Sequence, residues 1–365
     1  MRVPFLSSLK SWFGKTPPTQ IANNTPIKFQ SNATEFGNCN FVIKSKYDEL
    51  AKKILENSDR THWTRDSFRK EVNWDSHDVK QNILQTLNSL PSYELRDTAI
   101  MAISVSDGSE KDSLINSLME KGLPTGAELE KLKGLIADIQ FDAFKTITNH
   151  ALTAEQLAVA PLSKAIVFTK ARPLFQELSS QFVDDEGRHS HIFQDYLTEK
   201  LGGERKDSKS VVRDFDLFSL IVPIMPAGSV FLGLAVETVG GAFFEFFANH
   251  PKTPDPLFKA MCSAIYSRDE ERHMDICETL YKALHDKENQ GYLGSKWEEF
   301  RNKQMFRSIA KQVYGKQAGM DHYLMRSTQA LGIDPKDLFK HISSRVKDRF
   351  ARIGHKVDES LLPKL

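Results

Sequence analysis

Cysteine is scarce in this chain of 365 residues, which has only Cys39, Cys262 and Cys277. No two of them form a Cys-x-x-Cys pair, and an odd number leaves one thiol over if any disulfide forms. The first residues lack a charged segment followed by a long apolar one and a cleavage site, so no secretory signal is expected. We therefore expect reduced thiols in a cytoplasmic protein rather than a disulfide framework.

An excess of charge of either sign is also absent. Lys and Arg number 49 against 48 for Asp and Glu, which gives a net charge of +1. This balance excludes a strongly basic nucleic-acid-binding protein and a strongly acidic solvating chain, so no nucleic-acid partner is expected. Hydrophobic residues at 40% and charged residues at 27% are typical of a folded soluble protein.

Only the stretch Leu217–Val236 raises the question of a membrane span, because its twenty residues carry no charge. Its length would permit a span. Two prolines and two glycines interrupt it, however, and it leads directly into Glu237 and a phenylalanine-rich helical pattern. We therefore expect a buried core segment and no membrane span.

Alternating strand patterns with hairpin turns are missing, and helical periodicity takes their place. From about residue 43, Leu and Ile recur at spacings of three and four between Ser, Asn, Gly and Pro breaks. Helices are predicted near 46–58, 78–90, 93–103, 112–122, 127–147, 155–169, 173–201, 229–249, 255–285 and 292–331. The predicted fold class is all-α. It comprises a flexible tail (1–42), an N-terminal helical region (43–140), a bundle (141–290) and C-terminal helices that pack on it (291–365).

Two pentads in the bundle region match at four of five positions: DEGRH at 185–189 and DEERH at 269–273. In each, the Glu and the His lie three residues apart on a predicted helix, so both side chains can converge on one point. A carboxylate oxygen together with an imidazole nitrogen suits iron or manganese. The two pairs are Glu186 with His189 and Glu270 with His273.

Both pairs fall in apolar stripes rather than on charged faces. Leu178 and Phe182 step by four into Glu186, and Cys262 and Tyr266 step by four into Glu270. A carboxylate that points into a core is costly unless it is paired or bound to a metal. Because the same motif occurs twice, the sequence favours one shared metal site over two exposed, salt-bridged helix faces.

A helical di-metal site needs a glutamate from each of two further helices. Glu237 lies 33 residues before Glu270, and Glu155 lies 31 residues before Glu186. Each gap allows about half a helix, a loop and half a helix back. The predicted metal ligands are Glu155, Glu186, His189, Glu237, Glu270 and His273. The alternatives are Asp142 or His150 in place of Glu155, and Glu245 in place of Glu237.

The remaining charged residues of the pentads are predicted to support the ligands. Asp185 and Asp269 are expected to accept hydrogen bonds from the ligand imidazoles across the bundle. Arg188 and Arg272 would pair with these aspartates or with core carboxylates. The basic run at 345–352 is predicted to be a solvated helix face.

Over residues 150–285 the chain resembles the ferritin-like di-iron carboxylate oxygenases, and most closely the p-aminobenzoate N-oxygenase type. Its first motif, Glu186-Gly-Arg-His189-Ser190-His-Ile-Phe193, is similar to that family's Glu-x-x-His followed by Ser-x-x-Phe. The second motif is similar over 256–260, Ile265 and 269–273. The resemblance implies a ferritin-like four-helix bundle, often a homodimer, with two iron ions and O2 as co-substrate. Manganese or a mixed Mn/Fe centre remains open. It also implies N-oxygenation or hydroxylation of a small organic substrate, for which we expect an electron donor such as a reductase or ferredoxin.

One position departs from that family. Its extra histidine ligand, four residues before the second Glu-x-x-His glutamate, is Tyr266 here. Tyr266 is a candidate catalytic residue as an oxidisable neighbour of the metals, or alternatively a core residue or a hydrogen-bond donor behind the ligands. Soluble acyl-carrier-protein desaturases lack this histidine, and they share a pattern seen here from His189 to Tyr196. The alternatives to an oxygenase are a desaturase-like oxidase, a ferritin-like metal-binding protein without an organic substrate, and an interaction protein without chemistry.

Overall fold

The computed structural model describes residues 45–168, 173–207, 226–285 and 319–358, and the separate positions 212, 216, 219, 296–297, 300, 302–304 and 307. The chain divides into two compact units, Met1–Asn40 and Phe41–Leu365, and every described residue belongs to the second. The tail predicted for residues 1–42 and Cys39 therefore lie outside the described residues. Cys262 and Cys277 are free and buried.

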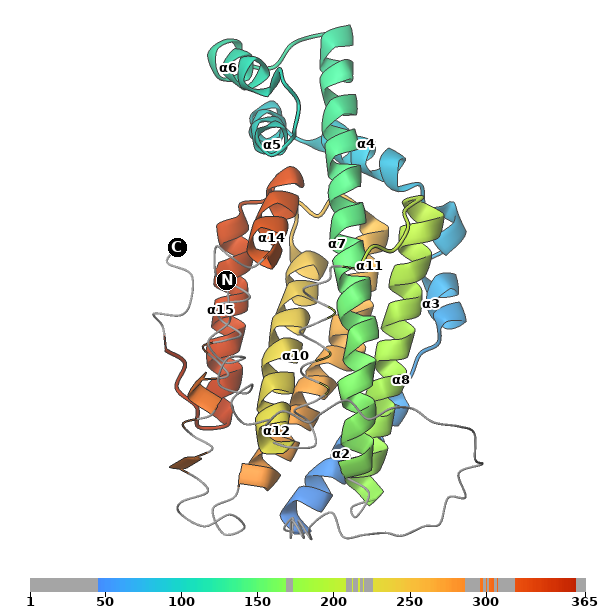
Figure 1. The fold of residues 1–365 in the computed structure, drawn as a ribbon. Coiled ribbons are helices and arrows are strands. Elements are labelled where there is room, and N and C mark those ends of the chain that lie inside the picture. The colour runs from blue at the N-terminus through green and yellow to red at the C-terminus, as the bar shows by residue number, and fades with distance from the viewer. Residues whose placement is uncertain are drawn as a thin grey trace, which may run out of the picture. The chain divides into compact units, whose positions relative to one another are not determined.

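Within the described ranges all regular structure is helical, so the all-α prediction is confirmed (Figure 1). The N-terminal part begins with α2 (Ser45–Thr61), α3 (Arg65–Glu71) and a 3₁₀ turn (Trp74–Ser76). Three further helices follow: α4 (Val79–Ser89), α5 (Ser92–Ser104) and α6 (Lys111–Lys121). The helix α3 was not predicted, because its seven residues, RDSFRKE, hold a single apolar side chain and show no periodicity.

The long helix α7 (Ala127–Phe168) replaces two separately predicted helices. The expected domain boundary at residue 140 lies inside it. Pro161 also lies inside it, where its ring removes one backbone donor. The helix nevertheless continues, and it packs along α8 (Pro173–Asp195), whose last turn widens into a π-helical segment at Tyr196–Lys200.

The helix α10 (Pro226–Asn249) packs against the continuous helical run Pro256–His285. This run consists of α11 (Pro256–Ile265), a π-helical segment η3 (Tyr266–Glu270) and α12 (Glu271–His285). Asp255 starts it, since its carboxylate accepts a hydrogen bond from the Phe258 amide at 2.9 Å and proline occupies the first turn. The predicted helix at 255–285 is thereby confirmed.

One described helix, Ala227–Asn249, is long and apolar enough to cross a membrane by length and composition alone, with a hydropathy of 1.6. Buried core helices meet the same criterion, and 56% of this window is buried inside the protein. Most of the preceding charge-free residues, at 217–225, lie outside the described residues.

The C-terminal helices are α14 (Gly319–Ala330) and α15 (Pro335–Arg352). The prediction of a solvated face at 345–352 is wrong for Arg349, which is 4% exposed. Its guanidinium donates to Asp275 and Glu271, both at 2.6 Å. A guanidinium can be buried where carboxylates of a packed helix neutralise it, and the sequence of α15 alone does not reveal that α12 supplies them.

Candidate metal centre

The six predicted ligands come together between four helical segments. Glu155 extends from α7, Glu186 and His189 from α8, and Glu237 from α10. Glu270 is the last residue of η3, and His273 lies in the first turn of α12. All six are buried.

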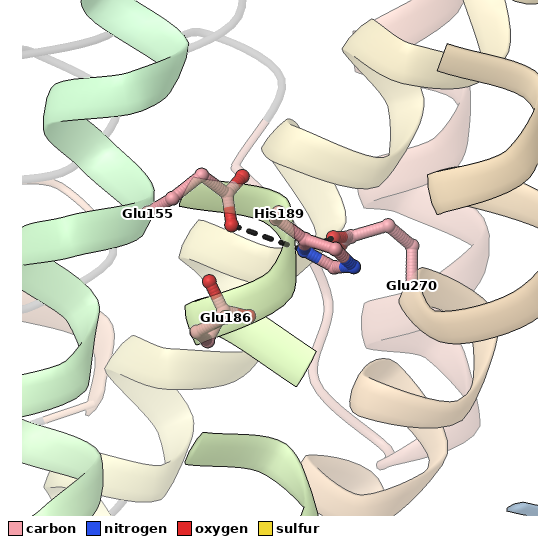
Figure 2. A group of neighbouring side chains, drawn as sticks. All are labelled: Glu155, Glu186, His189 and Glu270. Carbon is pink, nitrogen blue, oxygen red and sulfur yellow. Dashed lines mark hydrogen bonds and ion pairs between the residues drawn. The ribbon is translucent and has the colours of Figure 1, made fainter. Parts of the chain in front are cut away.

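These residues form two overlapping groups in which one possible ligand atom of each residue lies within 4.8 Å of the others. The first group, drawn in Figure 2, contains Glu155, Glu186, His189 and Glu270. The second contains Glu186, Glu237, Glu270 and His273. Because Glu186 and Glu270 belong to both groups, the two groups are adjacent and share two carboxylates, and each group has the donors to hold a cation.

The backbone around Glu270 is specialised in two ways. It ends a π-helical segment, whose wider turn changes the register between the apolar face of α11 and the ligands of α12. Across from it, Gly241 of α10 has no side chain. A Cβ atom at Gly241 would lie only 3.3 Å from the Cβ of Glu270 and 3.2 Å from the terminal methyl of Met274. The glycine therefore allows α10 to approach the cluster closely.

The two histidines have the same kinds of direct partner, an aspartate at Nε2 and glutamates at Nδ1. The Nε2 atom of His189 lies 3.0 Å from Asp269, while its Nδ1 lies 3.1 Å from Glu155 and 3.7 Å from Glu270. Each imidazole nitrogen thus has a distinct partner: Nε2 is held by Asp269. Nδ1 lies towards Glu155, and Figure 2 draws this contact.

His273 repeats this arrangement with the other pentad. Its Nε2 lies 3.0 Å from Asp185, and its Nδ1 lies 3.2 Å from Glu186 and 3.4 Å from Glu237. The aspartate of each pentad therefore supports the histidine of the other pentad. Such a contact fixes the orientation and the tautomer of a metal-binding imidazole.

Two buried arginines join the aspartates. Arg272 donates to Asp185 at 2.5 Å and to Asp269 at 2.8 Å. Arg188 pairs with Asp185 and with the more exposed Asp184. The guanidinium groups therefore hold the two pentads together behind the histidines.

Burial and mutual repulsion disturb the titration of the cluster. Burial and the neighbouring charge of Glu155 raise the pKa of Glu186 well above its usual value, and burial does the same for the pKa of Glu270. Burial disfavours a charged imidazole, but the hydrogen bonds to Asp185 and Glu237 and the charges of Glu270 and Asp185 together outweigh it and raise the pKa of His273 to about 9. Without a cation the cluster therefore retains protons that metal ligands must release.

The charges of this cluster suit two divalent cations. The arginines Arg188 and Arg272 offset the charges of Asp185 and Asp269. Four glutamate charges then remain when the carboxylates are ionised, and two divalent cations would neutralise them. Buried ionised carboxylates require such compensation.

Unused hydrogen-bonding capacity points the same way. The Nδ1 atom of His273 and the Oε1 atom of Glu186 are buried and lie 3.2 Å apart, and neither makes a well-aligned hydrogen bond with the described residues. Both face the centre of the second group. Because imidazole nitrogen and carboxylate oxygen are the ligands of helical di-iron and di-manganese sites, the residues present fit two such ions.

The alternative ligands lie outside both groups. Asp142 is largely exposed and pairs with Lys145 at 3.3 Å. Glu245 binds Arg345 and accepts a hydrogen bond from His341 at 2.8 Å. His150 is not part of either group.

Tyr266 is placed beside the cluster rather than in it. Its hydroxyl donates to Glu271 at 2.7 Å and accepts from Arg345 at 2.7 Å. Its ring lines a surface depression together with Thr238 and Met274. The depression lies next to the helix segment that carries Glu270.

Trp63, between α2 and α3, was not predicted from the sequence. Its indole Nε1 donates to Asp269 at 2.6 Å, across 206 residues of sequence. A lone tryptophan in a short polar connection has no periodic pattern to indicate a partner so far away. The region before residue 140 therefore contributes directly to the surroundings of the candidate site.

No protein-family model, no curated protein and no solved structure matches this chain. Its function is therefore inferred from the chemistry of these buried residues.

Proposed function

We propose that this chain is a ferritin-like di-iron protein that uses O2 to oxidise a small organic substrate. One observation carries the proposal: two Glu-x-x-His pairs and one glutamate from each of two further helices surround two adjacent cation positions. This donor set is the one that helical di-iron and di-manganese carboxylate proteins use. Manganese and mixed centres fit the same donors.

The proposed four-helix bundle consists of α7, α8, α10 and the run α11–η3–α12. Support comes from the packing of α7 along α8, of α10 along α12, and of α8 against α12. The burial of α10 favours its role as a core helix of a soluble protein.

Two iron ions in these positions would supply electrons for the reduction of O2. The protein residues hold and orient the ligands and keep water away. Phe182 stacks on His273 with ring centroids 3.9 Å apart, and Phe193 stacks on Phe244 at 5.6 Å. These four side chains are fully or almost fully buried, and Phe182 gives His273 an apolar neighbour. A reductase or ferredoxin would return the electrons.

The surroundings of Tyr266 favour a second candidate, a desaturase-like oxidase. Tyr266 takes the position of the extra histidine ligand of the N-oxygenase type, and its hydroxyl is bonded to Glu271 and Arg345. The six-ligand set without that histidine resembles the desaturases. Both candidates share the metal centre and differ in substrate.

Metal content per chain tests the proposal. We expect about two ions per chain after anaerobic loading with Fe(II), measured by elemental analysis. Glu270→Ala should lose most of this metal, because Glu270 belongs to both groups. Glu177→Ala, which removes an exposed glutamate of α8, is the matched control and should bind as the wild type does.

Near-zero metal in a folded, helical wild-type protein would overturn the proposal in favour of an interaction protein without chemistry. If two ions bind, O2 consumption with amine and with acyl substrates distinguishes the two candidate reactions. Metal binding without O2 consumption on any substrate would support a ferritin-like protein that has no organic substrate.

A further inference from the structure

The two aspartates that support the histidines have different partners. The Oδ2 atom of Asp269 binds His189 at 3.0 Å and receives the indole N–H of Trp63 at 2.6 Å. The Oδ2 atom of Asp185 binds His273 at 3.0 Å and receives a guanidinium N–H of Arg272 at 2.5 Å. At the corresponding atom, one aspartate therefore has a neutral donor and the other a cationic donor.

The remaining oxygen atoms increase this difference. Oδ1 of Asp185 pairs with Arg188, so both guanidinium groups bind this carboxylate. Oδ1 of Asp269 accepts a hydrogen bond from Arg272 at 2.8 Å, while Arg188 forms only a longer ion pair with it at 3.9 Å. Asp269 therefore has hydrogen bonds from one cationic and one neutral donor, whereas Asp185 has hydrogen bonds from two cationic donors.

Trp63 is held firmly in this place. It is 4% exposed, its ring lies nearly parallel to that of His189 at a centroid distance of 6.2 Å, and the Arg188 guanidinium lies over it at 5.6 Å. On the other histidine, the equivalent face is covered by Phe182, which has no donor. The indole thus supplies both a fixed hydrogen bond and a wall on one side only.

This difference changes the strength of the two imidazole ligands. A carboxylate that accepts the N–H of a ligand histidine increases the basicity of that histidine. Cationic partners withdraw charge from the carboxylate and reduce this effect. Asp269 therefore supports His189 more strongly than Asp185 supports His273.

We propose that Trp63 is a positioning residue that makes the two metal positions unequal, by holding Asp269 against His189 so that the Glu155–His189 position binds a divalent cation more tightly. The inference rests on the proposed function, because it presupposes a di-metal site. It adds an order of filling: the Glu155–His189 position is occupied first, and the Glu237–His273 position second.

Mn(II) titration followed by the electron paramagnetic resonance signal of free Mn(II) tests the proposal in two backgrounds. The first background, Glu237→Gln, weakens the Glu237–His273 position and leaves the Glu155–His189 position intact. The second background, Glu155→Gln, does the reverse. The Glu237→Gln background should bind Mn(II) more tightly than the Glu155→Gln background. Adding Trp63→Phe, which keeps an apolar ring but removes the N–H donor, should weaken Mn(II) binding about tenfold in the first background. In the second background the change should stay below twofold.

Trp74→Phe is the matched control in both backgrounds. Trp74 is also buried and donates its indole N–H to a carboxylate, Glu199, at 3.0 Å, but it has no contact with the cluster. It should leave Mn(II) affinity unchanged. If Trp63→Phe does not fold, Trp63→His, which retains a ring N–H, carries the test and should weaken the first background by less than tenfold.

Equal weakening in both backgrounds, or none in either, would overturn the role of Trp63. Tighter binding in the Glu155→Gln background would overturn the order of filling. Failure of the wild type to bind any Mn(II) or Fe(II) would instead overturn the proposed function, so the two failures are distinguishable.

Discussion

At Gly241, a missing side chain determines how closely α10 approaches Glu270. Gly241→Ala should strengthen the helix by about 1 kcal/mol through propensity alone. The new Cβ would, however, lie within 3.3 Å of Glu270 and 3.2 Å of Met274. We expect metal content to fall clearly below that of the wild type, measured by elemental analysis after loading.

Gly240→Ala is the control for this prediction, because a Cβ atom there meets nothing within 4 Å. It should keep full metal content and gain a slightly higher melting temperature. Full metal content in Gly241→Ala as well would show that Glu270 tolerates the displacement.

The Tyr266 hydroxyl connects η3 to α12 and α15 through Glu271 and Arg345. Tyr266→Phe removes one hydrogen-bond donor and acceptor, so the free energy of unfolding should fall by about 1 kcal/mol. Metal content should stay unchanged, because this hydroxyl bonds to groups outside the cluster. Denaturant unfolding and elemental analysis check both expectations. Loss of turnover at full metal content would instead assign Tyr266 a function in the reaction.

The clustering of the candidate ligand residues could be predicted in part because the spacing within each Glu-x-x-His pair is local. Two residues three positions apart on a helix share a face in any helical fold, so Glu186 with His189 needed no knowledge of the tertiary structure. The hydrogen bond from Trp63 to Asp269, by contrast, joins residues that lie 206 positions apart in the sequence. The need for glycine at position 241 depends on which helix lies opposite. Neither the Trp63 hydrogen bond nor the need for glycine at position 241 produces a recognisable sequence pattern in the segment that contains the residue.

Among the elements, α15 buries one cation, Arg349, within its otherwise largely apolar packed face. Arg349 is 4% exposed and binds Asp275 and Glu271 of α12. Arg349→Ala should lower the free energy of unfolding by about 2 kcal/mol. This is less than the roughly 3–5 kcal/mol of a fully buried pair, because both carboxylates are half-exposed. Arg352→Ala, at an exposed position of the same helix, should change it by less than about 0.5 kcal/mol. Similar losses in both variants, measured by denaturant unfolding, would contradict this.

The locations of the helices were easier to predict from the sequence than the points at which one helix continues into the next. Apolar periodicity indicated α2, α4, α5 and α6 because each has several apolar residues at helical spacing. It divided α7 in two at 148–154, because the sequence TNHALTA interrupts the apolar repeat there. The π-helical segment η3 was not predicted, since one additional residue in a turn preserves the apolar pattern on either side of it.

For the whole molecule, the raised pKa values predict how stability depends on pH. In the metal-free protein the folded-state pKa of His273 is about 9, against an ordinary value of 6.5. Its contribution to stability is therefore complete below pH 6.5 and is lost as pH rises through about 9. The raised pKa values of Glu186 and Glu270 act in the same direction, with stability lost as pH rises above about 4.5.

Metal binding reverses this trend, because the ligands must be deprotonated to bind. The difference in melting temperature between Mn(II)-loaded and metal-free protein should therefore widen from pH 6.5 to pH 9. Calorimetry at three pH values across this range, with and without chelator, measures it. A difference that stays constant or narrows would contradict the predicted proton release.

At the same scale, composition and periodicity were sufficient for the all-α class. They could not indicate that α2 and the connection after it would pack against the candidate site. That packing depends on surfaces which form only when α8 and α12 are already side by side. The burial of the Arg349 guanidinium of α15 likewise depends on a neighbouring helix, because α12 provides its carboxylate partners.

The exchange of partners between the two pentads has an evolutionary consequence. Asp185 supports His273, and Asp269 supports His189, so each motif completes the other. A substitution in one copy removes the partner of a residue 80 or 88 positions away. Among homologous sequences, positions 185 and 273 should therefore vary together, as should 189 and 269, while each copy drifts freely elsewhere. A lineage that gives up one aspartate is expected to lose the facing histidine next, so decay of the site would proceed in crossed pairs.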